Sequence, residues 1–378
     1  MNRRHILTCE YPPDVGGVAD YTRHIAEALA GSGEEVHVWC PATRERREAS
    51  GVHVHPGLGR FRPADLRRLS VRLDEFPAPR RILVQWVPHG FGYRSMNLWF
   101  CLWLAQRAMA GDGVELMVHE PFMELKRGPV RHVLMALVHR LMTLVLMQSA
   151  TRAWVAIPAW EPLLRPYTLR RQIRIEWLPI PGCVSSQACA PVSPIRARYA
   201  EGPQPLIGHF GSHGREVTAL LEERLVRIMD CSAKPALLLI GLGGDAFRAT
   251  LASRHPTWAD RVHATDYVAA AEVASYLDAC DILLQPYPDG ITSRRTSAMA
   301  CLSQGRPVVT TCGPLTEPLW KESGAVVLAD VSDTAGFASA VVGLIDDPGE
   351  RKRIARQGQC LYRERFTVDH VVTALRAA

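Results

Sequence analysis

Two loops of the sequence carry residues suited to binding a phosphate group. The first loop, Asp14-Val-Gly-Gly17, precedes an amphipathic segment. Its glycines, Gly16 and Gly17, allow backbone N–H groups to approach an anion at the positive end of a helix. The alternative is a tight strand-to-helix turn without a ligand. The loop lacks the G-x-G-x-x-G pattern of dinucleotide-binding turns, which disfavours a dehydrogenase.

The second loop lies in the stretch from Gln285 to Ala300, where an apolar run ends in a Pro/Gly segment and passes into a predicted helix. It contains Gly290, Ile291, Thr292, Ser293, Arg294 and Arg295 in succession. We expect helix N–H groups, the two hydroxyls and the guanidinium groups to converge on one anion, which outlines a diphosphate site. The alternative is a capped helix, with Thr292 or Ser293 as N-cap and solvated arginines.

A third candidate is His119, which follows the apolar run Leu116–Val118. A residue at the carboxyl end of a strand in an open α/β sheet lies at the crevice where ligands bind. The alternative is a histidine with a purely structural role.

The elements that position these residues are short apolar runs alternating with amphipathic segments, a pattern typical of βαβ units and parallel sheets. A proline-rich stretch near residues 178–205 separates two such series. We therefore predict an α/β chain of two Rossmann-like domains facing each other across a cleft. The expected divisions are residues 1–185, residues 186–360, and a C-terminal helix over 361–378 that packs back toward the first domain. The predicted strands are Ile6–Cys9, Val36–Trp39, Ile82–Trp86, Leu116–His119, Ala153–Ala156, Leu206–Phe210, Ala236–Ile240, Asp281–Gln285, Pro307–Thr311 and Val326–Leu328.

Composition fits this organisation, since 378 residues with 47% hydrophobic and 22% charged side chains describe a globular protein of two domains. Residues 1–190 hold 24 Lys and Arg against 17 Asp and Glu, whereas residues 191–378 hold 20 against 21. A basic first half suits an anionic surface or substrate. Ten cysteines without a C-x-x-C pair or zinc-type spacing indicate reduced thiols of a cytoplasmic protein. The N-terminus lacks the features of a signal peptide.

The most apolar window is Val133–Met147, which contains His139 and Arg140. Its 15 residues are too few, and its centre too polar, to cross a bilayer, so we predict no transmembrane segment. The favoured interpretation is a buried domain helix. The alternative is an interfacial helix, because the window follows basic residues from Arg127 onward and is rich in Met and Leu, which would allow peripheral membrane contact.

Several motifs in this order resemble the retaining glycosyltransferases of family 4, which have the GT-B fold. The motifs are Glu10-Tyr-Pro-Pro-Asp-Val-Gly-Gly-Val-Ala-Asp-Tyr-Thr22, His119-Glu-Pro121, Leu178-Pro-Ile-Pro181, Gly208-His-Phe-Gly211 and Ser297-Ala-Met-Ala-Cys-Leu-Ser-Gln-Gly-Arg-Pro-Val-Val309. The resemblance covers essentially the whole chain. It implies transfer of a sugar, with retention, from a nucleotide-sugar co-substrate bound mainly by the C-terminal domain. The acceptor, a glycan, a lipid-linked saccharide or a small molecule, would lie on the N-terminal domain, and neither a cofactor nor nucleic acid is expected.

The resemblance also assigns residues. Gly16 and Gly17 match the glycine loop near the donor phosphates, and His119 matches the histidine beside the donor sugar. The Glu-x7-Glu element of the family falls on Asp289 and Ser297. Its first acid contacts the sugar and its second the ribose, so this chain keeps a shortened sugar acid and lacks the ribose acid.

The family's cations after the first C-terminal strand are reduced here to Arg215, which follows Gly211 without a nearby lysine. We hypothesise that Arg294 and Arg295 supply the missing charge. The growing charge of a leaving diphosphate is then stabilised by preorganised cations and N–H dipoles. No metal is expected, and the sequence has no Asp-x-Asp motif. Asp20 and Glu120 are candidate acceptor contacts or bases, with a solvated or structural role as the alternative.

Two other functions share this architecture. A sugar-nucleotide epimerase would need paired acids in the cleft. A nucleotide-sugar-binding pseudoenzyme would explain why Asp289 and Ser297 replace two glutamates. The sequence leaves the base, the sugar, the acceptor and the linkage open.

Overall fold

The computed structural model describes residues 3–14, 16–41, 51–182, 184 and 191–377. The chain forms two compact units, unit 1 from Met1–Ile180 with Val368–Ala378, and unit 2 from Pro181–Thr367. The division therefore falls at residues 180/181, where we expected 185/186, and the chain returns to unit 1 at Val368, where we expected 361. The arginine-rich stretch 44–47, Cys183 and Cys189 lie outside the described residues.

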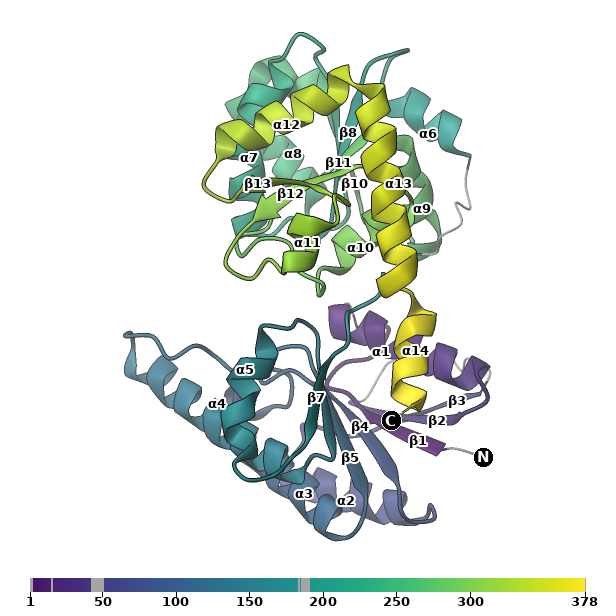
Figure 1. Cartoon of the computed structure of the whole chain (residues 1–378), viewed down its shortest axis with the longest axis vertical. Helices are drawn as coiled ribbons and strands as arrows, with labels where there is room; N and C mark the ends of the chain where they lie inside the picture. The colour runs from purple at the N-terminus through teal and green to yellow at the C-terminus, as the bar shows by residue number, and fades with distance from the viewer. Residues whose placement is uncertain (1–2, 15, 42–50, 183, 185–190, 378) are drawn as a thin grey trace. The chain divides into compact units, whose positions relative to one another are not determined.

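Unit 1 is built on a seven-stranded parallel sheet with the order β3-β2-β1-β4-β5-β6-β7 (Figure 1). The strands are β1 (Arg3–Leu7), β2 (Glu35–Cys40), β3 (Val52–Pro56), β4 (Arg81–Trp86), β5 (Gly113–Val118), β6 (Arg152–Val155) and β7 (Arg174–Trp177). The helices are α1 (Gly17–Gly31), α2 (Pro63–Asp74), α3 (Leu98–Met109), α4 (Val130–Ser149), α5 (Trp160–Leu164) and α14 (Val368–Arg376), with 3₁₀ turns η1 (Tyr93–Ser95) and η2 (Arg165–Thr168).

The C-terminal helix α14 is fixed to this sheet by a buried arginine. Arg4 on β1 pairs with Glu34 at 3.0 Å and with Glu115 at 3.4 Å, and it donates a hydrogen bond to the carbonyl of Leu375 at 2.9 Å. Val371 on α14 is buried in the same apolar cluster as residues of α1 and β1. The end of the chain is thus an integral part of unit 1.

Unit 2 is built on a six-stranded parallel sheet with the order β10-β9-β8-β11-β12-β13 (Figure 1). The strands are β8 (Leu206–Phe210), β9 (Ala236–Ile240), β10 (Val262–Asp266), β11 (Ile282–Gln285), β12 (Val308–Cys312) and β13 (Val327–Asp330). The helices are α6 (Val192–Tyr199), α7 (Arg215–Met229), α8 (Gly244–Arg254), α9 (Ala270–Ala279), α10 (Thr296–Ser303), α11 (Pro318–Glu322), α12 (Thr334–Asp346) and α13 (Pro348–Arg365), with the 3₁₀ turn η3 (Pro256–Arg261).

Both sheets follow from the apolar runs of the sequence. All five residues of β9 are buried, as expected for a strand covered on both faces by helices. Around the sheet of unit 1, α1 buries Ala19, Tyr21, Thr22, Ile25, Ala26 and Leu29, at helical spacing. The two parallel α/β sheets confirm the predicted fold class.

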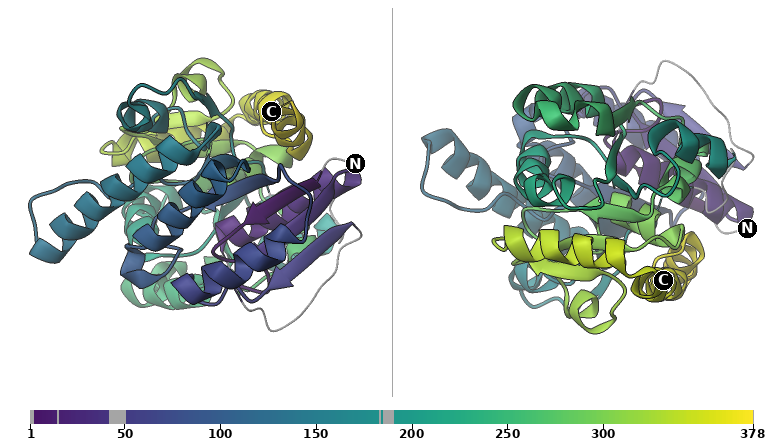
Figure 2. Two further views of the ribbon diagram at one scale, coloured as in Figure 1. Left: turned by 90° about the horizontal axis from the view of Figure 1, so that it is seen from below. Right: turned by 90° about the horizontal axis from the view of Figure 1, so that it is seen from above.

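Helix α4 extends beyond the apolar window Val133–Met147, which by itself is too short to cross a bilayer. It is 20 residues long, so by length and composition alone it could cross a membrane, a test that core helices also pass. It buries Ala136, His139, Met142, Thr143, Leu146, Met147 and Ser149 against the rest of unit 1. Its first half extends away from unit 1 as an arm (Figures 1 and 2). The favoured interpretation of a buried helix therefore holds for one side of α4 only.

Candidate functional site

The candidate residues of unit 2 gather at the carboxyl edge of its sheet. The chain passes from β8 to β9 on one side and later returns to β11 on the other side of β8, so the loops after β8 and β11 diverge. Such a switch point is where open α/β sheets bind ligands. Gly211 follows β8, and a Cβ atom placed on it would lie 3.9 Å from Ser297 Oγ. The two expected loops are therefore neighbours.

Gly290 gives the loop after β11 its sharp turn. Its φ of +84° is in the left-handed region, and a Cβ atom there would lie 2.3 Å from the backbone nitrogen of Gly313. A side chain at this position is excluded both by backbone conformation and by the neighbouring loop. The next residue, Ile291, is buried and donates its N–H to the carbonyl of Thr311 over 2.8 Å. The loop is held rigidly where it enters the site.

Asp289, Arg294 and Arg295 form a charged cluster on this loop. Oδ2 of Asp289 accepts hydrogen bonds from Arg294 at 3.3 Å and from Arg295 at 3.1 Å. The Arg295 guanidinium also lies over the ring of Tyr287, 4.6 Å from its centroid. Two guanidinium groups share one carboxylate, so the formal charge of the three side chains is +1. The arginines are thus ordered by the protein rather than solvated, unlike in the capped-helix alternative.

The hydroxyl groups of the loop behave differently from the prediction. Ser293 is fully buried, and both its N–H and its hydroxyl donate to Glu317 Oε1, over 2.9 and 2.6 Å. Burial raises the pKa of Glu317, while these hydrogen bonds oppose the rise. Thr292 is also fully buried, and its Oγ1 has no hydrogen-bond partner among the described residues. Neither residue caps α10, whose N-cap is Arg295.

Ser297, at the position where the resemblance predicts a second glutamate, belongs to a neutral hydrogen-bond network. Its Oγ lies 2.8 Å from the hydroxyl of Tyr287 and 3.3 Å from Gln285 Oε1. The Tyr287 hydroxyl also donates to Gln285 Oε1 over 2.9 Å. Burial raises the pKa of Tyr287 above its usual range, so the network carries no charge at neutral pH.

Two further residues complete this edge. Arg215 begins α7, is exposed, and makes no ion pair within the part of the chain that the structure describes. His209, on β8, was not predicted as a site residue although it belongs to the quoted Gly208–Gly211 motif. Its Nδ1 donates to the carbonyl of Leu284 over 2.8 Å, and burial lowers its pKa to about 3. Its Nε2 is therefore an acceptor, with no partner among the described residues.

The first loop of unit 1 holds an anion of its own. Glu10 Oε1 accepts hydrogen bonds from the N–H groups of Val18 and Ala19, over 3.1 and 3.0 Å, at the start of α1. A Cβ atom on Gly16 would lie 2.2 Å from the same oxygen, so this glycine makes room for the carboxylate. Gly17 faces open space at that point. A phosphate bound at these N–H groups would have to displace Glu10.

His119 lies just after β5 and is buried. Its Nε2 donates to Gln85 Oε1 over 2.8 Å, and its ring meets that of Tyr21 edge to face at 5.0 Å. Burial lowers the pKa of His119 to about 3, so the ring is neutral near pH 7 and Nδ1 is an acceptor. A neutral histidine of this kind accepts a hydrogen bond from a hydroxyl and is not a general acid. The nearby candidates differ, since Asp20 is exposed on α1 and Glu120 is half-buried.

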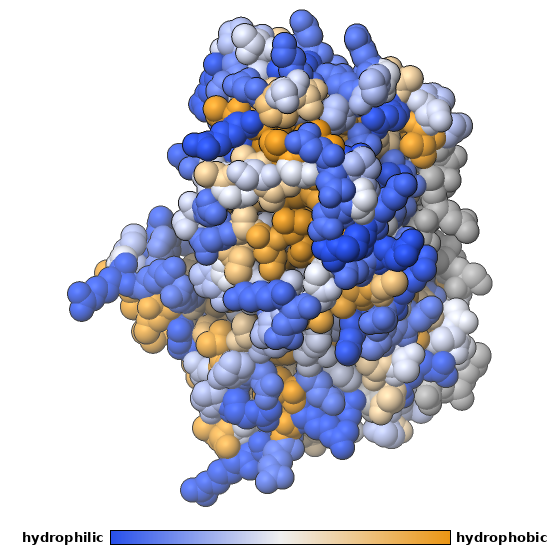
Figure 3. All heavy atoms as spheres, turned by 45° about the horizontal axis from the view of Figure 1, so that its top comes forward, coloured by the Kyte–Doolittle hydropathy of each residue, from blue (hydrophilic) through white to orange (hydrophobic). Residues whose placement is uncertain are grey.

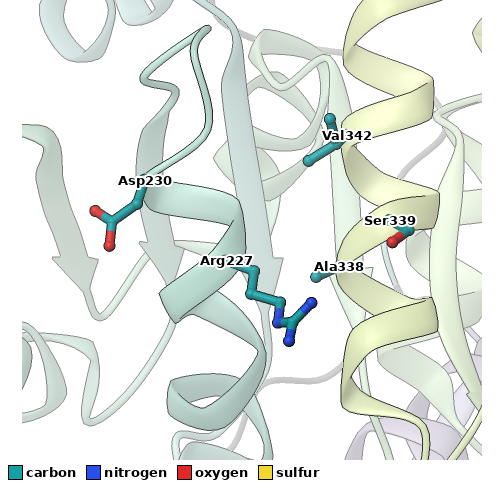
Figure 4. A pocket seen from close by; sticks show the side chains of 5 residues that line it. All are labelled: Arg227, Asp230, Ala338, Ser339 and Val342. Carbon is teal, nitrogen blue, oxygen red and sulfur yellow. The ribbon is translucent and has the colours of Figure 1, made fainter.

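A hollow elsewhere in unit 2 does not belong to this site. Arg227, Asp230, Ala338, Ser339 and Val342 line it, between α7 and α12 (Figure 4). Helix α7 starts at the carboxyl edge of the sheet and ends near Arg227 and Asp230, so the hollow lies at the opposite edge.

No group of three or more His, Cys, Asp or Glu among the described residues is placed to hold a metal ion.

Comparison with known proteins supports a specific fold. Residues 204–347 match the family model described as glycosyl transferases group 1, a segment that includes the whole candidate site of unit 2. No curated protein matches the chain significantly. Solved structures match it over its full length, among them sucrose-phosphate synthase from Thermosynechococcus elongatus, with a TM-score of 0.76 and 16% identity over 100% of this chain and 98% of that one. The chain has the GT-B fold.

Two more GT-B structures agree. HepE from Anabaena, solved in complex with UDP, has a TM-score of 0.71 and 14% identity, covering 100% of this chain and 99% of that one. WaaG, a glycosyltransferase involved in lipopolysaccharide biosynthesis, has a TM-score of 0.68 and 15% identity, covering 99% and 98%. The family match and the fold together support a glycosyltransferase.

Proposed function

We propose that this GT-B protein transfers a sugar from a nucleotide-sugar donor to an acceptor, with retention of the anomeric configuration and without a metal ion. The observation that carries the proposal is the cluster of Asp289, Arg294 and Arg295 at the switch point of unit 2. This cluster presents ordered cations where an open α/β sheet binds its ligand. Its position within the glycosyl transferases group 1 match supports the same role.

The chemistry assigned to the cluster is stabilisation of the leaving group. Cleavage of the anomeric C–O bond leaves a nucleoside diphosphate, on which negative charge grows. Guanidinium groups held in place before the reaction stabilise that charge without reorganising, which is usually the largest single catalytic contribution. Arg294 and Arg295 are assigned this role, with Arg215 as a third cation at the same edge. Asp289 holds the two guanidinium groups and is the candidate contact for the donor sugar.

The other assigned contacts are neutral. His119 is assigned to the donor sugar on the family resemblance, and its unprotonated Nδ1 would accept a hydrogen bond from a sugar hydroxyl. Ser297 Oγ and His209 Nε2 both lie within 4 Å of the Cβ position of Gly211, at 3.9 and 3.8 Å, and are assigned to the ribose hydroxyls in place of the family carboxylate. Asp20 and Glu120 remain the candidates for the acceptor side.

Ligand-induced stabilisation tests the donor assignment. A ligand that binds the native state raises the melting temperature, so the chain is screened against UDP, GDP, ADP and dTDP and their sugar conjugates, with Mg²⁺ and with EDTA. UDP is the first choice because HepE was solved with UDP. The expected result is a shift with one base that is the same in both buffers. A shift seen only with Mg²⁺ would contradict metal independence, and no shift with any nucleotide would contradict the donor site.

The mutational test pairs Arg294→Ala and Arg295→Ala with the control Arg254→Ala. Arg254 is also an ion-paired arginine of unit 2, bound to Glu222 at 2.7 Å, but it lies at the end of α8. Loss of turnover in the two test variants alone supports the proposal. The anomeric configuration of the product, read by NMR, tests retention directly, and an inverted product would refute it.

Binding without transfer is a second candidate, favoured by two observations. Ser297 replaces a carboxylate of the family, and Glu10 already occupies the N–H groups at the start of α1. A protein of this kind would bind a nucleotide sugar tightly and neither hydrolyse it nor transfer its sugar to any member of a broad acceptor panel. Release of nucleoside diphosphate in the presence of one acceptor would exclude this candidate.

A further inference from the structure

The solvent-facing side of helix α4 has an unusual composition. A surface helix normally turns its polar face to water and its apolar face to the core. Arg131 and His132 are exposed in the first turn of α4, but four further exposed positions, Val130, Leu134, Leu137 and Leu141, are apolar, and their spacing of three or four residues places them on one stripe. Their exposed fractions run from 84% for Val130 to 45% for Leu141. The opposite side of α4 is the one that packs into unit 1.

We call these four residues the α4 stripe. It lies along the arm that α4 forms in Figures 1 and 2, and the same arm in Figure 3 carries hydrophobic atoms along its side and hydrophilic atoms at its tip. Across an 18-residue window of α4 the mean hydropathy is 1.5, and 33% of that window is buried. Contact with water along such a stripe is unfavourable, so a surface of this kind marks an interaction site.

Charge at the tip of the arm indicates the partner. Lys126, Arg127 and Arg131 are all exposed where the chain enters α4. Lys126 pairs with Glu124 at 2.7 Å, whereas α4 itself contains no Asp or Glu. Arg127 and Arg131 make no ion pair with any residue that the structure describes. An apolar stripe bordered by such arginines complements the interface of an anionic bilayer, where the stripe enters the acyl boundary and the guanidinium groups meet lipid phosphates.

We propose that α4 docks unit 1 on the surface of an anionic lipid bilayer, lying in the interface rather than crossing it. The buried side of α4 supports this orientation, because residues such as His139 and Met142 are packed into unit 1 and are not available to lipid. A glycosyltransferase docked in this way would meet acceptors held in a membrane. The docking itself does not depend on the proposed transfer reaction, so failure of one leaves the other standing.

Flotation with lipid vesicles tests the proposal on the full chain. The probes are vesicles of phosphatidylcholine alone and vesicles of phosphatidylcholine with phosphatidylglycerol, each at low and high salt. We expect the chain to float with the anionic vesicles at low salt and to bind the neutral ones at least several-fold more weakly. No binding to either kind of vesicle, or equal binding to both, would overturn the proposal.

Variants assign the binding to α4. Leu134→Ser with Leu137→Ser should weaken vesicle binding by roughly tenfold or more, since two large apolar side chains leave the lipid contact. The matched control is Val71→Ser with Leu169→Ser, which removes two apolar side chains of unit 1 that are each 67% exposed. Circular dichroism verifies that each variant is folded. Equal loss of binding in both double variants would overturn the assignment to α4.

A second pair of variants tests the charge. Arg127→Glu with Arg131→Glu should abolish the preference for anionic vesicles, whereas Arg67→Glu with Arg170→Glu, at exposed positions elsewhere in unit 1, should preserve it. Sedimentation velocity tests the competing occupant, a second copy of the chain. A dimer that dissociates when Leu134 and Leu137 are replaced, without any vesicle binding by the unmodified chain, would overturn lipid docking in favour of self-association.

Discussion

Two substitutions in the arginine cluster of unit 2 should move nucleotide affinity in opposite directions. Arg295→Ala changes the formal charge of Asp289, Arg294 and Arg295 from +1 to zero, and Asp289→Asn changes it to +2. If the cluster binds the diphosphate, the first variant weakens binding of the free nucleoside diphosphate and the second strengthens it. A purely structural cluster would respond to both substitutions in the same direction, through loss of order.

The expected magnitude follows from the exposure of the three side chains. Arg294 and Arg295 are 20% and 25% exposed and Asp289 is 41% exposed, so the cluster is partly screened by water. A unit charge about 5 Å from a phosphate contributes about 1 kcal/mol in water and about 3 kcal/mol at an effective dielectric constant of about 20. A change in affinity of roughly 5- to 150-fold in each direction is therefore expected, since each 1.4 kcal/mol is about tenfold. Turnover of the Arg295→Ala variant should fall by roughly 10²- to 10³-fold, as for loss of one preorganised donor.

Isothermal titration calorimetry with UDP at low and high salt measures the two affinities, since salt screens the interaction of partly exposed charges. Arg254→Ala is the control, because it removes an ion-paired arginine at the far end of α8. Asp289→Asn should bind UDP more tightly but transfer sugar more slowly, if Asp289 also contacts the donor sugar. The reasoning is refuted if both variants shift the UDP affinity in the same direction, or if neither shifts it more than twofold.

Three other perturbations test the structure around the site. Arg4→Met should lower the free energy of unfolding by about 3–5 kcal/mol, measured by urea titration, because it leaves the buried Glu34 carboxylate without its buried partner; a loss below 1 kcal/mol would contradict this. Burial lowers the pKa of His5 and of His119 from 6.5 to about 3, so each binds a proton below pH 6.5 only after unfolding. The free energy of unfolding therefore decreases as the pH falls below 6.5, by about 2 kcal/mol per histidine at pH 5. Urea titrations that give the same free energy of unfolding from pH 7 to pH 5 would contradict this prediction. Glu10→Ala should cost about 1 kcal/mol through loss of the cap on α1 and, if a phosphate binds there, tighten UDP binding; unchanged UDP affinity would assign Glu10 to capping alone.

The strands that the sequence predicts and those that it misses differ in their place in the sheets. The missed strands are β3, β7 and β10, and each lies at the edge of its sheet. Central strands are covered on both faces and therefore appear as continuous apolar runs. An edge strand carries polar residues, as in Val52-His-Val-His-Pro56 of β3 and Arg174-Ile-Glu-Trp177 of β7. Their pairing depends on a neighbour that is already in place, which a local pattern does not encode.

The sequence predicts which loops form the candidate site of unit 2, but it does not predict which hydrogen bonds hold these loops. The loop after β11 is predicted from its hydroxyls and arginines at the start of a helix, and the loop after β8 from the family resemblance at Gly211 and Arg215. Glu317, in contrast, binds Ser293 across 24 positions of sequence, and no spacing rule links the two. Glu10 was quoted as part of a motif, yet its function as a cap on α1 follows only from the fold of the loop between them. Hydrogen bonds of this kind form only when the fold brings together residues that are not neighbours in the sequence.

These two carboxylates change the expected source of electrostatic stabilisation. Both loops were expected to offer backbone N–H groups to an anion, and the second loop its hydroxyls as well. Instead, Glu10 accepts the N–H groups at the start of α1, and Glu317 accepts both donors of Ser293. Donors satisfied within the chain stabilise a ligand only after a rearrangement that costs free energy. The cations assigned to the diphosphate at the carboxyl edge of unit 2 are the side chains of Arg215, Arg294 and Arg295. Diphosphate binding by this protein should therefore depend on salt more steeply than binding by a loop that relies on backbone dipoles, because cationic side chains at the surface are screened.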